Sequence, residues 1–81
     1  MLFKKGNDFA EITQAISADT NDTVWYVHTN LDWENLPVDF RVQVSETDQE
    51  GLEKLKNALV KWADSKGFKL VLKIGSSPNS L

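Results

Sequence analysis

Residues 47–67, TDQEGLEKLKNALVKWADSKG, decide the fold class because they hold the longest helical pattern of the chain. Large apolar side chains recur there at intervals of three or four residues, as on one face of an amphipathic helix. They are Leu52, Leu55, Leu59 and Trp62. Thr47 and Glu50 fit a capping box at the start, and Gly67 is the glycine that commonly follows a helix. The sequence therefore predicts a helix over residues 48–66.

Three neighbouring segments have the pattern of strands. Residues 68–74 alternate large apolar side chains with Lys69, Val71 and Lys73, and residues 38–45 alternate Val or Phe with polar residues. Residues 24–29, VWYVHT, consist of β-branched, aromatic and imidazole side chains. In this third strand the pleat directs Trp25, Val27 and Thr29 to one face, and Val24, Tyr26 and His28 to the other.

The N-terminal part predicts a second, shorter helix. Asn7 is a good N-cap, and Phe9, Ile12 and Ile16 recur at helical spacing over residues 8–16. A polar segment rich in turn-forming residues follows and ends it. Residues 2–5 either form a short edge strand or lead into this helix without regular structure.

These elements give the order (β)αββαβ and an α+β fold. We expect a two-layer sandwich, with a mainly antiparallel sheet of three or four strands and two helices on one face. If the first strand forms, the plan is ferredoxin-like. A chain of 81 residues supports one hydrophobic core, so we expect a single domain over residues 1–75 and a flexible tail over residues 76–81.

The composition excludes several kinds of chemistry. Without cysteine there is no disulfide, thiol nucleophile or cysteine-bound zinc, and His28 has no second histidine with which to bind a metal. The four glycines are too scattered for a phosphate-binding loop. We therefore expect no catalytic residue, no cofactor and no metal, and a non-enzymatic protein. No run of ~18 apolar residues and no signal-peptide core occurs, which favours a cytoplasmic protein without a membrane partner.

The charges are segregated along the chain although the net charge is only −3. Residues 32–53 carry one arginine against seven acidic residues, and residues 54–81 carry six lysines against one aspartate. Such segregation can steer a charged partner by complementary potential. The preference of acids for helix N-termini and of lysines for C-terminal halves explains part of it equally well.

Trp33 lies in the loop NLDWENLP (residues 30–37), between acidic neighbours. It is either an exposed aromatic anchor for a partner or a cap that folds back onto the core. The leading hypothesis is a small acidic inhibitor or adaptor that binds a protein with a basic site, of which nucleic-acid mimicry is a special case. It uses this loop and the start of the helix over 48–66, assumed to be adjacent. The predicted partner-binding residues are Asp32, Trp33, Glu34, Glu46, Asp48 and Glu50.

The alternative hypothesis is binding of nucleic acid or a small ligand on the open face of the sheet. The residues that would carry it are Tyr26, His28, Arg41, Lys69 and Lys73. Aromatic rings beside cations are typical of single-strand binding. The negative net charge and the absence of an RNP-type pattern disfavour nucleic acid. A homodimer through edge strands is compatible with either hypothesis.

Overall fold

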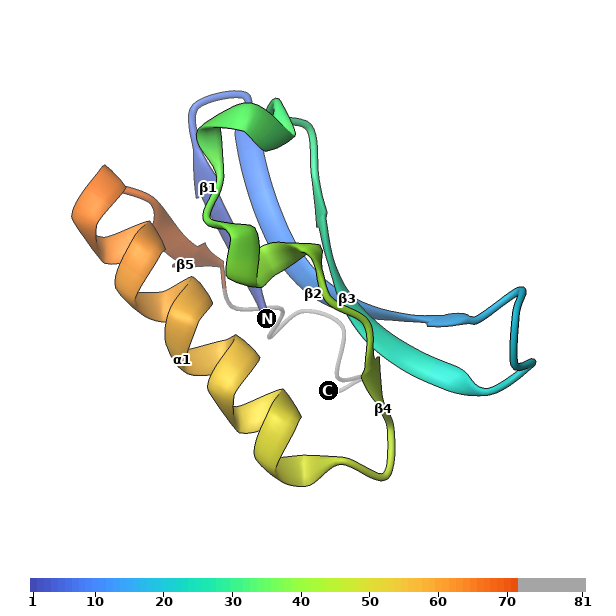
Figure 1. Cartoon of the computed structure of the whole chain (residues 1–81). Helices are drawn as coiled ribbons and strands as arrows, with labels where there is room; N and C mark the ends of the chain where they lie inside the picture. The colour runs from blue at the N-terminus through green and yellow to red at the C-terminus, as the bar shows by residue number, and fades with distance from the viewer. Residues whose placement is uncertain (72–81) are drawn as a thin grey trace, which may run out of the picture.

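The computed structural model describes residues 1–71 and shows an antiparallel five-stranded sheet with one helix packed against one face (Figure 1). The strands are β1 (Leu2–Lys5), β2 (Asp8–Ile16), β3 (Thr23–Thr29), β4 (Val44–Ser45) and β5 (Lys69–Val71), and their order in the sheet is β4-β3-β2-β1-β5. The helix is α1 (Gln49–Lys66), and two short 3-10 turns, η1 (Trp33–Asn35) and η2 (Val38–Arg41), join β3 to β4. The α+β class and the antiparallel sheet are therefore confirmed, whereas the two-helix, ferredoxin-like order is not.

The predicted helix over residues 8–16 is wrong, because this segment forms strand β2. Gly6, with φ of +63°, opens a two-residue loop that joins β1 to β2 with Lys5 opposite Asp8. Within β2, Ala10 and Ile12 are buried in the core two positions apart. The helical spacing of Phe9 and Ile16 with Ile12 was a coincidence, because both lie outside that core cluster.

Of the two alternatives for residues 2–5, strand or irregular structure, the structure shows the strand, β1. It forms, and it lies inside the sheet between β2 and β5, with Phe3 opposite both Ala10 and Leu70. The predicted strand over 24–29 is confirmed as β3, and its register with β2 places Val27 opposite Ile12. Because directly opposed residues share a face, Val27 points toward the helix, as predicted, and Tyr26 and His28 point away.

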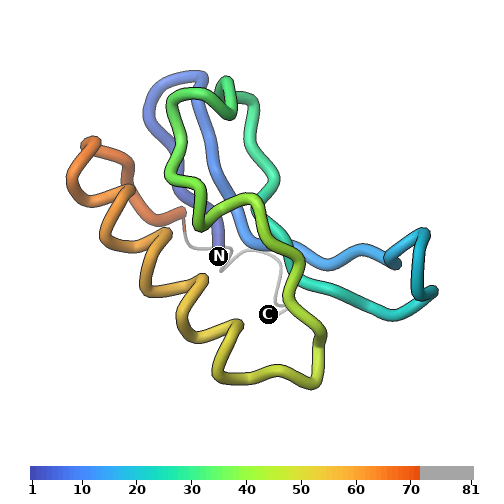
Figure 2. The backbone as a smooth tube through the Cα atoms, viewed as in Figure 1, coloured from blue at the N-terminus to red at the C-terminus, as the bar shows by residue number. Residues whose placement is uncertain are grey.

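The far end of the β2–β3 hairpin extends beyond the rest of the molecule (Figure 2). Its six-residue loop is closed by a 2.8 Å hydrogen bond from the Ser17 amide to the Asp22 carbonyl. Ile16 at this end is 69% exposed, although Ile12 in the same strand is 4% exposed. The sheet is therefore covered by the helix only along the proximal part of the hairpin.

The predicted strand over residues 38–45 is mostly wrong. Pro37 starts a 3-10 turn in which the Phe40 amide donates to the Pro37 carbonyl at 3.0 Å, and only β4 pairs with β3. The alternation suggested four inward side chains, but Phe40 and Val44 are buried whereas Val38 and Val42 are exposed. A turn of this kind lets every second apolar residue of the segment remain on the surface.

Helix α1 confirms the predicted helix with one correction, which concerns its N-cap. Asp48 rather than Thr47 caps it, because the Asp48 carboxylate accepts from the Gly51 amide at 3.0 Å. A Cβ at position 51 would collide with that carboxylate, so the glycine makes room for the cap. The Thr47 hydroxyl instead hydrogen-bonds the Ser45 hydroxyl. Gly67 ends the helix with φ of +81°, as expected.

We expect Asp48→Ala to lower the free energy of unfolding by about 1 kcal/mol, because it removes the partner of a first-turn amide. Thr47→Ala is the matched control and should change it by less than about 0.5 kcal/mol. Urea denaturation of both variants measures the difference. Equal losses in the two variants would contradict the assignment of Asp48 as the cap.

The core lies between α1 and the inner face of the sheet, and its most deeply buried large side chains are Phe40, Leu59 and Val27. Trp62, on the apolar face predicted for the helix, and Trp25 are partly buried and pack against it. The Trp62 ring contacts Phe40 edge-on, with the centroids 5.7 Å apart. Phe40 thereby joins η2 to the helix.

The predicted strand over 68–74 is confirmed for Lys69–Val71; Phe68 precedes this strand, and residues 72–74 lie outside the described part of the chain. The same holds for the predicted tail over 76–81. Within residues 1–71, no helix combines the length and hydrophobicity that a membrane crossing requires.

Candidate functional site

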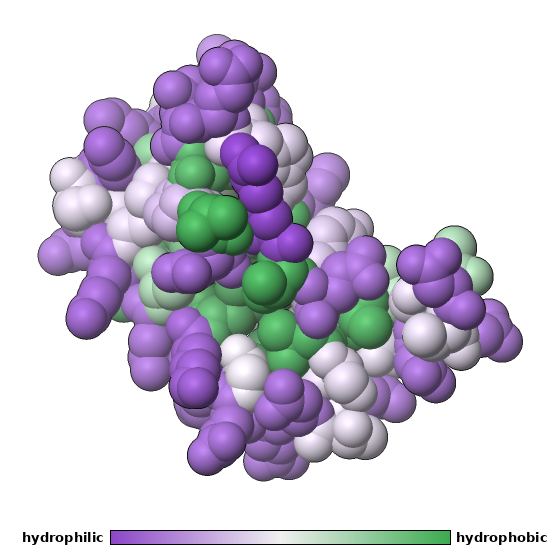
Figure 3. Space-filling model, viewed as in Figure 1, coloured by the Kyte–Doolittle hydropathy of each residue, from purple (hydrophilic) through white to green (hydrophobic). Residues whose placement is uncertain are grey.

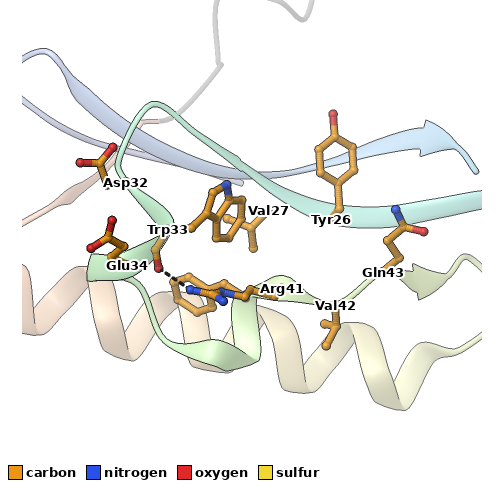
Figure 4. Close-up of a pocket in the computed structure, with 9 residues that line it drawn as sticks. Tyr26, Val27, Asp32, Trp33, Glu34, Arg41, Val42 and Gln43 are labelled. Atoms are coloured by element: carbon orange, nitrogen blue, oxygen red, sulfur yellow. Dashed lines mark hydrogen bonds between the residues drawn. The ribbon is translucent and has the colours of Figure 1, made fainter.

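An open groove of about 610 Å³ lies between β3 and the segment that contains η1 and η2 (Figure 4). It forms because β4 pairs only with Val24 and Trp25, so the chain between β3 and β4 runs beside the rest of β3 without joining the sheet. Its lining residues are Tyr26, Val27, Asp32, Trp33, Glu34, Phe40, Arg41, Val42 and Gln43. Three of the six predicted partner-binding residues, at positions 32–34, are thus in one site.

Hydrogen bonds hold the loop that carries Trp33. The Asn30 side chain accepts from the Phe9 amide at 2.9 Å and donates to the Asn7 carbonyl at 3.0 Å, which ties the end of β3 to the β1–β2 turn. In η1, the Leu36 amide donates to the Trp33 carbonyl at 3.1 Å. Leu36 is buried in the core, so the loop is anchored on both sides of Trp33.

Trp33 itself is 40% exposed and does not belong to the core cluster. Of the two alternatives considered from the sequence, the core-cap role therefore belongs to its neighbour Leu36. Figure 4 shows the Trp33 ring standing beside Val27, with the Arg41 side chain running below it. One Arg41 guanidinium nitrogen donates to the Trp33 carbonyl at 3.0 Å. Arg41 therefore links η2 to η1 and holds the Trp33 main chain in place.

The two ends of the groove differ in chemistry. In Figure 4 the side chains of Asp32 and Glu34 lie on one side of Trp33, and Tyr26 and Gln43 lie on the other. Part of the lining is apolar: it includes Val27, Phe40 and Val42, and Val42 is 45% exposed. Figure 3 shows hydrophobic side chains gathered in the middle of this face of the molecule. The site thus combines an exposed tryptophan, an apolar floor and an acidic end.

The other predicted acidic residues are elsewhere. Glu46, Asp48 and Glu50 lie around the start of α1, and Figure 1 shows that this end of the helix is at the opposite end of the molecule from η1. The expectation that the two acidic segments are adjacent is therefore wrong. The intervening η2 and β4 run the length of the helix and separate them. Asp48 has a structural role as the helix cap.

The residues of the alternative site are only partly brought together. Tyr26 and His28 share the outer face of β3, with ring centroids 6.5 Å apart, and Lys69 lies on the same face, paired with Lys4. Arg41 is not on that face, because it lies in η2, which is not part of the sheet. Lys73 lies outside the described residues.

The outer face has two further residues that the sequence reasoning missed. The Phe9 ring lies 5.2 Å from the His28 ring, and Lys4 is paired with Phe9 across β1 and β2. Phe9 was missed because residues 8–16 were interpreted as a helix, and Lys4 was missed because a strand over residues 2–5 was only one of two alternatives. The signal that could have found them is the dipeptide Gly6-Asn7, a typical two-residue hairpin loop. Phe40, Val42 and Gln43 of the groove were missed because their segment was expected to form a strand.

Metal binding has no support in the part of the chain that the structure describes. Within residues 1–71, no three His, Asp or Glu side chains lie close enough together to hold a metal ion.

Comparison of the chain with protein-family models, with curated proteins and with solved structures gives no significant match.

Proposed function

We propose that this protein is a non-enzymatic protein-binding domain, of the small acidic inhibitor or adaptor kind, and that it binds its partner through the groove beside Trp33. The observation that carries the proposal is Trp33 itself: a tryptophan 40% exposed at the edge of an apolar groove, on a loop held by hydrogen bonds. Tryptophan and arginine are the residue types most enriched at interface hot spots, and both line this groove.

The rigidity of the loop supports the proposal energetically. Because the Trp33 backbone is held by Arg41 and by the η1 turn, binding would order few additional torsions. Preorganisation of this kind leaves more of the contact free energy for affinity. The groove is open to solvent, which lets a side chain that protrudes from a partner protein enter it.

The acidic end favours a partner with a basic site. Asp32 and Glu34 are exposed at the rim, where charges mainly raise the association rate and select against acidic partners. Of the six predicted residues, the proposed surface keeps Asp32, Trp33 and Glu34. The acidic residues at the start of α1 form a separate surface and are not needed for the groove.

We expect Trp33→Ala to weaken binding of the partner by at least about 30-fold, because truncating a tryptophan hot spot costs about 2 kcal/mol or more. The measurement is capture from a native lysate with immobilised wild type, followed by titration of the captured protein. Ile16→Ala is the control: it removes a more exposed apolar side chain, at the far end of the hairpin. Equal affinity of the partner for the Trp33→Ala and Ile16→Ala variants would contradict the proposal.

A second candidate function is binding of single-stranded nucleic acid on the outer face of the sheet. The observation that favours it is the run of three rings, Tyr26, His28 and Phe9, next to Lys4 and the paired Lys69. Bases stack on such rings while lysines contact phosphates. The net charge of −3 opposes it, which is why it is second.

The second candidate requires affinity for a random single-stranded oligonucleotide that falls as salt rises. Phe9→Leu should then weaken binding by about fivefold or more, because one stacking interaction is worth about 1–3 kcal/mol. Fluorescence anisotropy between 50 and 200 mM salt measures both effects. Absence of binding at the lowest salt concentration would remove this candidate.

A further inference from the structure

The two ends of the groove beside Trp33 differ in the side chains that line them. Its acidic end, formed by Asp32 and Glu34, lies on one side of the indole. Val27 lies beside the indole, and Val42 lies on the other side together with Tyr26 and Gln43 (Figure 4). A ligand that fills the whole groove must therefore present two different groups. One is apolar and packs beside Trp33, and the other reaches the two carboxylates.

The charge of the lining determines the sign of the second group. Asp32 and Glu34 contribute two negative charges, and Arg41 contributes one positive charge. The Arg41 guanidinium donates to the Trp33 carbonyl oxygen, which holds this cation below the indole. The acidic end is thus complementary to an incoming cation, and an anionic ligand would meet repulsion from both carboxylates.

From these two features we infer that the groove recognises a segment of the partner in which a large apolar side chain lies beside a lysine or arginine. The apolar side chain occupies the space between Trp33 and Tyr26, and the cation reaches Asp32 and Glu34. This inference rests on the proposed function and specifies its ligand. Lysine and arginine suit the position because their long alkyl stems can pack along the tryptophan while the charge stays in water.

The test uses short capped peptides and the indole N–H resonances in a ¹H–¹⁵N NMR spectrum. Three tetrapeptides, Gly-Lys-Leu-Gly, Gly-Gln-Leu-Gly and Gly-Lys-Ser-Gly, are acetylated and amidated, so that only the side chains differ. Trp33→Phe assigns the Trp33 resonance, and those of Trp25 and Trp62, which pack against the core, serve as internal references. We expect the Lys-Leu peptide to shift the Trp33 signal, and each of the other two to bind about three- to tenfold more weakly.

Charge variants of the protein complete the test. Asp32→Asn combined with Glu34→Gln should weaken binding of the Lys-Leu peptide by about three- to tenfold. The affinity for the Gln-Leu peptide should stay unchanged. The matched control is Asp19→Asn combined with Glu46→Gln, which makes the same change of net charge at exposed positions outside the groove. Raising the salt concentration should reduce the difference between the two peptides.

The outcomes separate this inference from the proposed function. Equal affinity for the Lys-Leu and Gln-Leu peptides would overturn the inference, yet Trp33→Ala could still abolish capture of a partner. A Trp33 signal that no peptide shifts, or that moves with protein concentration alone, would also overturn it; in the second case a second copy of the chain occupies the groove.

Discussion

Replacing Phe40 by alanine should lower the free energy of unfolding by about 3–5 kcal/mol. Phe40 is 1% exposed, the largest of the fully buried side chains, and its ring meets Trp62 edge-on. The substitution removes the phenyl ring from the core and leaves a cavity between η2 and α1. A domain of 81 residues has a total stability of about 4–12 kcal/mol, so this loss is a large share of it. Thermal and urea denaturation followed by circular dichroism measure it.

Val38→Ala is the control, because Val38 lies in the same 3-10 turn but is 72% exposed. It should change stability by no more than about 0.5 kcal/mol. Comparable losses in the two variants would mean that Phe40 does not pack into the core. Since Phe40 also lines the groove, the alanine variant should lose binding together with stability. Binding experiments are therefore better interpreted with Trp33.

Ile12→Ala should cost about 2–4 kcal/mol, whereas Ile16→Ala should cost less than about 0.5 kcal/mol. In strand β2, Ile12 is 4% exposed and packs in the core, while Ile16 is 69% exposed at the end of the hairpin. A helix over residues 8–16 would place both side chains on one buried face and make the two losses similar. The pair of variants therefore distinguishes strand from helix, and the measurement is the urea midpoint of each.

Valine variants at the two positions keep the β-branched shape and serve as controls. Ile12→Val should lose about 0.5–1.5 kcal/mol, less than Ile12→Ala. Ile16→Val should be neutral, because its side chain has no core contact to lose. A destabilised Ile16→Ala combined with an unaffected Ile12→Ala would contradict the register of β2 with β3.

The fold could be predicted where a pattern has a single physical interpretation. Helix α1 carries its apolar stripe over 18 residues and ends at Gly67, and β3 is rich in β-branched and aromatic residues. Residues 8–16 were misread because their apolar residues fit a helix at spacings of three and four. What decides for a strand is the two-residue loop at Gly6, which pairs the segment with β1.

The candidate site could be predicted only in part, for a related reason. The sequence pointed to Trp33 with Asp32 and Glu34 because an aromatic residue between acids has no place in a core pattern. It did not place Glu46 or Asp48 correctly, because no local pattern shows whether two separate acidic segments lie close together in space. The other wall of the groove depends on the early end of the β3–β4 ladder, which no local pattern encodes.

The pairing of β1 with β5 has a consequence for how the chain is made. Leu2 lies opposite Val71, so the sheet joins segments from the beginning and the end of the described chain. During synthesis the β2–β3 hairpin and α1 can form locally, but β1 keeps an open edge until β5 has left the ribosome. Until then Phe3 and Leu70 cannot meet, and an unpaired strand edge is prone to association with other chains.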